Sequence, residues 1–265
     1  MRPRHTLVAL TATAATAAAV LLTALPANAS SANYVALGDS YSSGLGAGNY
    51  GSSGSCDRSS GAYPQLWANN NSPSSFTFAA CSGATTSDLL SSQLSAVNSG
   101  TTLVSFTIGG NDVGFSSVME TCVIWGTSSC VSAVNSAESQ AQSTLPAAYD
   151  NVLNSIRAKA PNATIVFLDY PDFYDLNASS GCIGLSGTSR AKIDEGINLL
   201  DSLIQQAAAR HGAIFGDVRG SFSGHEICDS NSWLNSVDWT NFGDSYHPTA
   251  AGQANGYYPV FAAKA

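Results

Sequence analysis

Short apolar runs alternate along this chain with longer helical patterns, and this alternation restricts the folds that the chain can adopt. Each apolar run is followed by a turn that contains glycine, serine or proline. Such runs indicate strands buried on both faces, and strands that alternate with helices predict a parallel sheet with helices on both sides. The predicted strands cover residues 34–37, 76–80, 101–108, 164–169 and 213–218.

Apolar side chains at helical spacing predict helices between and after these strands. Two of them cover residues 145–160 and 190–210, and a proline or glycine closely follows each pattern. Another covers residues 249–258 and is entered through Pro248. We expect Pro259 to end or kink this last helix, because proline lacks the backbone N–H that would continue it.

The first 29 residues have the pattern of a secretory signal peptide. Two arginines precede an apolar run at 7–25, and Ala27 and Ala29 fit a signal peptidase site. A transmembrane anchor is the alternative, but the run is rich in small residues and ends at the cleavage pattern. We therefore expect a secreted, extracellular protein with no integral membrane segment after cleavage. Residues 30–265 are then long enough for a single domain.

The mature chain is acidic. The whole sequence has 10 lysines and arginines against 18 aspartates and glutamates, and the signal segment holds two of the basic residues and no acid. The mature charge is therefore −10, which disfavours nucleic acids and anionic membranes as partners. An apolar content of 44% indicates a folded domain rather than a disordered chain.

Six cysteines lie in the mature region, and in an exported chain this even number predicts three disulfides. None of them forms a Cys-x-x-Cys motif, so a thiolate zinc site is not expected. Sequence alone leaves the pairing open, although Cys122 and Cys130 enclose a short loop that a disulfide closes easily. The cysteines are Cys56, Cys81, Cys122, Cys130, Cys182 and Cys228.

The first candidate for chemistry is Ser40, in a Gly-Asp-Ser-Tyr-Ser segment directly after the first predicted strand. Ligands bind at the carboxyl ends of the strands in open parallel sheets. A serine at a strand-to-helix turn exposes its hydroxyl there, and its own N–H lies where a helix start favours anions. Helix capping explains this serine as well when it is considered alone. The segment also differs from the Gly-x-Ser-x-Gly elbow of the α/β-hydrolases.

The mature chain has three histidines that could serve as a base. His211 ends a predicted helix, where a cation suits the helix dipole, and His225 lies in a glycine- and serine-rich loop. His247 follows the last strand and comes just before the last helix. Asp244, three residues earlier, could hold the other ring nitrogen, which is the orienting role in a catalytic triad.

Two further turns could stabilise an oxyanion. Asn111 follows two glycines directly after the third predicted strand, and its side chain offers N–H donors. Gly83 follows the second predicted strand. The N–H groups of Ser40 and Gly83 and the Asn111 side chain would together form an oxyanion hole. The glycines of either turn, taken alone, are equally consistent with tight turns.

These motifs, in this order, resemble those of the GDSL or SGNH hydrolases, and most closely the secreted streptomycete esterases and lipases. The four letters of the second name fall on Ser40, Gly83, Asn111 and His247. The resemblance extends over residues 34–252. Tyr41 replaces the leucine of the GDSL motif, which leaves the nucleophile unchanged.

The resemblance implies an α/β fold, namely a three-layer α/β/α sandwich with a parallel, flavodoxin-like five-stranded sheet and no metal or other cofactor. Some streptomycete members resemble Ser-His dyads in which a main-chain carbonyl replaces the acid. Either Asp244 or the Ser245 carbonyl could therefore orient His247. The implied disulfides pair sequentially as Cys56–Cys81, Cys122–Cys130 and Cys182–Cys228.

The sequence therefore leads to the hypothesis of a secreted, monomeric serine hydrolase that cleaves small-molecule or lipid esters through an acyl-enzyme. A carbohydrate acetyl esterase is an alternative within the same chemistry. A non-catalytic binding protein on the same fold is another. A metal-dependent phosphatase is disfavoured, because clustered metal-ligand spacings are missing.

Overall fold

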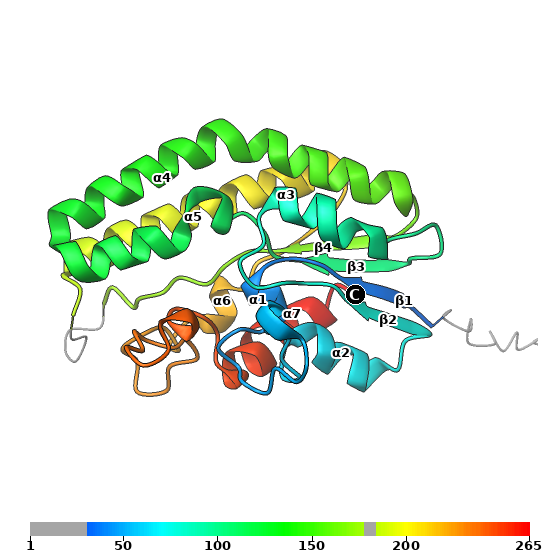
Figure 1. The fold of residues 1–265 in the computed structure, drawn as a ribbon, viewed down its shortest axis with the longest axis horizontal. Coiled ribbons are helices and arrows are strands. Elements are labelled where there is room, and N and C mark those ends of the chain that lie inside the picture. Colours follow the sequence, from blue (N-terminus) through cyan, green and yellow to red (C-terminus); the bar gives the residue numbers. More distant parts are fainter. Residues whose placement is uncertain (1–30, 178–183) are drawn as a thin grey trace, which may run out of the picture. The chain divides into compact units, whose positions relative to one another are not determined.

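Five short strands form one parallel sheet in the order β2-β1-β3-β4-β5 (Figure 1). The computed structural model describes residues 31–177 and 184–265. Each strand overlaps one of the runs expected from the sequence, so the predicted parallel α/β sheet is confirmed. The strands are β1 (Asn33–Ala36), β2 (Ser75–Phe78), β3 (Leu103–Phe106), β4 (Thr164–Leu168) and β5 (Ile214–Gly216).

The centre of the sheet is buried on both faces. Val35 of β1 pairs with Thr77 of β2 on one side and with Val104 of β3 on the other. Every residue of β3 is buried, as expected for a strand that is covered by helices on both sides. The edge strand β2 alternates instead between exposed and half-buried residues.

Helices cover both faces of the sheet, which gives a three-layer sandwich (Figure 1). One layer contains α3 (Thr86–Asp88), α4 (Phe115–Lys159) and α5 (Gly187–His211). The opposite layer contains α2 (Tyr63–Asn71), α6 (Arg219–Phe222) and α7 (Tyr258–Ala262). Both α4 and α5 extend past the sheet, beside the edge where the strands end.

The helix expected at 145–160 is only the last part of α4, which begins at Phe115. Gly126 has φ 78° and interrupts the helical geometry, so α4 consists of a short and a long segment. The first half of the long segment was missed because it is rich in polar residues. Its buried stripe there is narrow, since it packs mainly against α5.

Pro259 was expected to end or kink the last helix, and the structure shows that it does not end it. A π-helical stretch, η6 (Gly252–Tyr257), leads directly into α7, and Pro259 lies in the first turn of α7. A first helical turn tolerates proline, because its N–H groups have no partner within the helix. The wider π turn just before Pro259 therefore lets the chain continue in helical form to Ala262.

The structure contains the Cys56–Cys81 and Cys122–Cys130 disulfides. Cys182 lies outside the described residues, so the pairing Cys182–Cys228 stays a prediction. The signal peptide expected at residues 1–29 also lies outside them. Within residues 31–177 and 184–265, no helix is both long enough and apolar enough to cross a membrane.

Candidate active site

The order of the strands brings the predicted site residues to one edge of the sheet. Ser40 follows β1, which lies between β2 and β3 in the sheet. Gly83 follows β2, and Asn111 follows β3. Because parallel strands end at the same edge, the Ser40 turn is flanked by the other two turns.

A tight turn places Ser40 at the start of α1 (Ser40–Ser43). Gly38 has φ 120°, and a Cβ added there would lie 2.6 Å from the carbonyl oxygen of Thr107, so the turn requires glycine. The side chain of Gln93 binds both the N–H and the carbonyl of Gly38, at 2.7 and 2.8 Å. Asp39 caps α1 by accepting a hydrogen bond of 3.0 Å from the Tyr41 N–H.

His247 lies within hydrogen-bond distance of Ser40. Its Nε2 is 2.7 Å from the Ser40 Oγ, and its Nδ1 is 3.0 Å from the carbonyl oxygen of Ser245. A carbonyl only accepts hydrogen bonds, so Nδ1 carries the proton and Nε2 is left to accept the serine proton. Burial lowers the pKa of His247 to about 4, although the bond to Ser245 opposes the shift. The imidazole is therefore neutral at pH 7 and can act as a base.

The Asp244 carboxylate is engaged elsewhere. It accepts hydrogen bonds from the Tyr50 hydroxyl at 3.1 Å and from the Asn241 side-chain nitrogen at 2.8 Å. Asp244 contacts His247 through its main-chain oxygen, which accepts the backbone N–H of His247 at 3.2 Å. Of the two orienting groups that the sequence left open, the Ser245 carbonyl is therefore the one placed at the imidazole ring.

Tyr246 determines where the Ser245 carbonyl points. Its φ of 67° is rare for a residue other than glycine, and it turns the chain back so that residue 245 faces the ring of residue 247. Contacts from distant parts of the chain hold this conformation. The Tyr41 hydroxyl donates to the Tyr246 carbonyl at 2.7 Å, and Phe173 stacks on the Tyr246 ring at 5.5 Å.

Of the candidate oxyanion donors other than the Ser40 N–H, Asn111 shares a small pocket with Ser40. The Asn111 side chain donates one N–H to the Ala84 carbonyl at 3.0 Å, which leaves its second N–H for a ligand. This bond also ties Asn111 to the turn that contains Gly83. Gly83 has φ 77° and borders a neighbouring hollow.

Sequence reasoning missed a hydrogen-bonded link behind the nucleophile, formed by Asp39 and Tyr170. Tyr170 follows β4, and its hydroxyl donates to the Asp39 carboxylate and accepts the Gly110 N–H at 3.3 Å. Thr107 donates to the same carboxylate at 2.6 Å. Burial raises the pKa of Asp39 to about 6, against the effect of these hydrogen bonds. The position of Tyr170, directly after a strand, was the only sequence signal for it.

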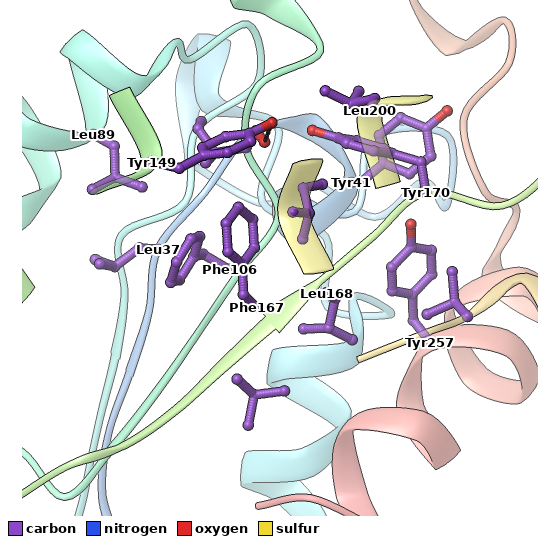
Figure 2. Close-up of a cluster of buried hydrophobic side chains, with 14 of the residues drawn as sticks. Leu37, Tyr41, Leu89, Phe106, Tyr149, Phe167, Leu168, Tyr170, Leu200 and Tyr257 are labelled. Carbon is purple, nitrogen blue, oxygen red and sulfur yellow. Dashed lines mark hydrogen bonds between the residues drawn. The ribbon is translucent and has the colours of Figure 1, made fainter. Parts of the chain in front are cut away.

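Aromatic packing supports this link. Tyr170 packs edge to face on Tyr41 with ring centroids 4.9 Å apart, and Figure 2 shows both rings within the buried core. Tyr41 in turn lies 5.1 Å from the His247 ring, centroid to centroid. The side chains on either side of Ser40 are therefore parts of one packed cluster.

The two other histidines among the described residues make contacts of a structural kind. His211 is the last residue of α5, and its Nε2 lies 2.8 Å from a side-chain oxygen of Asp150 on α4. His225 stacks on Trp233 with ring centroids 3.6 Å apart. In the part of the chain that the structure describes, no group of three or more histidine, cysteine, aspartate or glutamate side chains is placed to hold a metal ion.

Comparisons with known proteins agree with the fold and with the family resemblance. The model of the GDSL-like Lipase/Acylhydrolase family matches residues 36–254. Lipase 1 of Streptomyces coelicolor is 54% identical over 248 residues, which cover 93% of this chain and 91% of the relative.

Solved structures give the same result. The crystal structure of phospholipase A1 from Streptomyces albidoflavus has a TM-score of 0.86 and 54% identity, covering 89% of this chain and 100% of that one. The extracellular lipase of Streptomyces rimosus also has a TM-score of 0.86, with 50% identity over 88% of this chain and 100% of that one. The chain therefore belongs to the GDSL-like lipase/acylhydrolase family, which is a family of ester hydrolases.

Proposed function

We propose that this protein is a secreted lipase or esterase that hydrolyses carboxylic esters through a Ser40–His247 dyad and an acyl-enzyme. The observation that carries the proposal is the 2.7 Å contact between Ser40 Oγ and His247 Nε2. A neutral imidazole at this distance can remove the hydroxyl proton as the oxygen attacks an ester carbonyl.

The other ring nitrogen keeps the base in the required tautomer. The Nδ1–H of His247 donates to the Ser245 carbonyl at 3.0 Å, so Nε2 faces Ser40 as an acceptor. The same carbonyl dipole stabilises the imidazolium that forms when Ser40 loses its proton. His247 then gives that proton to the leaving alcohol. A water molecule, activated by the same imidazole, releases the acid from Ser40.

The negative charge on the tetrahedral intermediate needs donors that are already in place. Ser40 N–H, Gly83 N–H and the free N–H of the Asn111 side chain are the proposed donors. Loss of one donor of this kind costs about 100- to 1000-fold in rate. Asn111→Ala should fall in that range, and part of its effect would come from loss of the bond to Ala84.

Export is supported by the sequence pattern of residues 1–29 and by the disulfides of the folded chain. The Streptomyces rimosus relative is described as an extracellular lipase. We propose that residues 30–265 form one catalytic domain after cleavage, and the compact unit formed by the described residues from Ser31 onward supports this proposal.

The test is hydrolysis of p-nitrophenyl acyl esters by wild type, Ser40→Ala and a matched control, Ser91→Ala. Ser91 is exposed, so its variant should keep wild-type activity. Ser40→Ala should lose turnover by at least about a thousandfold while its circular dichroism spectrum stays unchanged. Retained turnover in folded Ser40→Ala would exclude the proposed nucleophile. Acetylated xylan belongs in the same assay, because cleavage of that substrate alone would favour the carbohydrate esterase.

A further inference from the structure

Six large apolar side chains are exposed among the described residues, and four of them occur as two close pairs. The first pair is Ile124 and Trp125 in α4, and the second is Trp239 and Phe242 in the loop that precedes His247. The two tryptophans are the most exposed of the six, at 69% and 72%. Scattered apolar residues are common on protein surfaces, but a group of them on one face marks an interaction site.

One hollow places the two pairs on the same face. Val123, directly before the first pair, and Trp239 of the second pair both line it. Figure 1 shows the bend of α4 and the loop after α6 on the side of the molecule where the strands end. We call the two pairs together the apolar rim, which consists of Ile124, Trp125, Trp239 and Phe242.

A disulfide anchors the first pair. Cys122 and Cys130 are buried and bonded to each other, and residues 124–128 between them are exposed. Gly126 interrupts the helical geometry here, so the pair lies at a bend of α4. A bend that is anchored at both ends loses little conformational freedom when it contacts a partner. The first pair is therefore presented to the solvent in a form that is ready to bind.

The second pair is hydrogen-bonded to the loop that orients His247. The ring centroids of Trp239 and Phe242 lie 6.4 Å apart, so the two rings belong to one small cluster. The backbone N–H of Asp238, directly before Trp239, donates to the Ser245 Oγ at 2.9 Å. The carbonyl of the same serine accepts from the His247 imidazole. A partner that contacts the second pair would therefore lie close to the proposed dyad.

The charges near the rim restrict the kind of partner. Residues 115–156 and 220–263, which contain the rim, have no lysine or arginine but seven acids, among them Asp238 next to Trp239. An anionic lipid layer would be repelled by these carboxylates. A phosphatidylcholine layer instead presents its cationic choline groups to the solvent, and aromatic rings attract such groups. Tryptophan also prefers the level of the head groups, because its ring is apolar and its N–H is polar.

We propose that the apolar rim docks the protein on a zwitterionic phospholipid layer, with Trp125 and Trp239 at the level of the head groups. This inference goes beyond the proposed ester hydrolysis, since docking requires neither an ester nor a catalytic residue. The hydrogen bond between Asp238 and Ser245 keeps the proposed dyad near the docked layer.

Vesicles of diether phosphatidylcholine test the docking, because ether lipids contain no ester that the protein can cleave. Co-sedimentation measures the binding of wild type, Trp125→Ala and Trp239→Ala. Each variant should weaken the binding at least about tenfold, which is the effect of losing one large apolar side chain from the lipid. Ile214→Ala is the matched control and should bind as wild type does, because Ile214 is exposed at 39% on the edge strand β5, outside the rim. Diether phosphatidylglycerol vesicles should bind wild type more weakly at low salt.

The two tryptophan variants lie on different elements, which keeps the test independent of how either one folds. Failure of wild type to bind the choline vesicles, or equal binding by wild type and both variants, would overturn the proposal. Stronger binding to phosphatidylglycerol would do the same, because it would show attraction by charge. Sedimentation velocity tests a second copy as the partner, and a wild-type dimer that Trp125→Ala dissociates would assign the rim to that dimer instead. If Ser40→Ala still hydrolyses esters, the dyad has failed, but the docking result is unaffected.

Discussion

The imidazole Nδ1 of His247 lies 3.0 Å from the main-chain carbonyl oxygen of Ser245, two residues earlier in the chain. A hydrogen bond across so short a separation requires a sharp turn, and the positive φ of Tyr246 provides it. The group that orients the proposed base therefore belongs to the backbone. No single side-chain substitution can remove it, which makes the neighbouring carboxylate the informative place to mutate.

Asp244→Asn should keep activity within about tenfold of wild type, whereas loss of a true triad carboxylate costs about 10⁴-fold. The reason is that the Asp244 carboxylate binds Tyr50 and Asn241 instead of the imidazole. The measurement is kcat on a p-nitrophenyl ester, with Asp238→Asn as a control in the same loop. A fall of several thousandfold in folded Asp244→Asn would show that the carboxylate reaches His247 during turnover.

Tyr170→Phe should lower kcat about tenfold with little change in KM. The Tyr170 hydroxyl joins the Asp39 carboxylate to the Gly110 N–H, next to the proposed donor Asn111. One hydrogen bond of this kind is worth about 1 to 1.5 kcal/mol, which corresponds to about tenfold in rate if the loss is confined to the transition state. Tyr149→Phe is the matched control, because its hydroxyl donates to the Ile108 carbonyl outside this link. Equal kinetics for the two variants would rule out a positioning role for Tyr170.

The acid limb of the pH profile should lie well below the ordinary pKa of histidine. Burial lowers the pKa of His247 to about 4, so the free base persists into acidic solution. The value of kcat/KM at pH 5.5 should therefore be close to that at pH 7.5, after folding has been checked at each pH. The profile is measured with an ester whose hydrolysis is followed by titration. Because burial raises the pKa of Asp39 to about 6, the profile is repeated with Asp39→Asn, and an acid limb near pH 6.5 that persists in this variant would show that the base titrates as an exposed histidine.

Two buried aspartates should make folding weaker as the pH rises. Burial raises the pKa values of Asp169 and Asp201, and Arg219, whose Nε lies 3.6 Å from Asp169, opposes the shift in part. The folded chain therefore holds protons that the unfolded chain releases above about pH 4. The free energy of unfolding is highest below that pH, as far as these groups are concerned, and falls as the pH rises through their folded pKa values.

Asp201→Asn should flatten this dependence and stabilise the protein at pH 8, because an amide carries no charge to bury. The amide oxygen can still accept the Tyr170 backbone N–H, which Asp201 accepts at 3.1 Å. Denaturant unfolding of wild type and variant at pH 5, 6.5 and 8 measures the slope. Asp217→Asn should instead lower the free energy of unfolding at pH 8, because the hydrogen bond from the Arg219 guanidinium lowers the pKa of exposed Asp217 and so stabilises its charged form. A variant at Asp201 that is less stable than wild type at pH 8 would contradict the assignment.

Local sequence patterns were enough to predict the five strands and the order of the motifs. Apolar runs and turns are local patterns, so strands overlapping all five predicted ranges were found, and the turns after β1, β2 and β3 carry Ser40, Gly83 and Asn111. Parallel topology then requires these turns to share one edge of the sheet. The long first part of α4 escaped prediction because its apolar face is narrow and becomes evident only beside α5.

Contacts between distant parts of the chain determine which group faces the imidazole of His247. The choice between the Asp244 carboxylate and the Ser245 carbonyl depends on the backbone conformation of Tyr246, and the Tyr41 hydroxyl, 205 positions away, helps to hold that conformation. The link from Asp39 through Tyr170 likewise joins residues 131 positions apart. Sequence periodicity reports which face of an element is apolar, but it carries no information on contacts between distant loops, because these form only once the elements have packed.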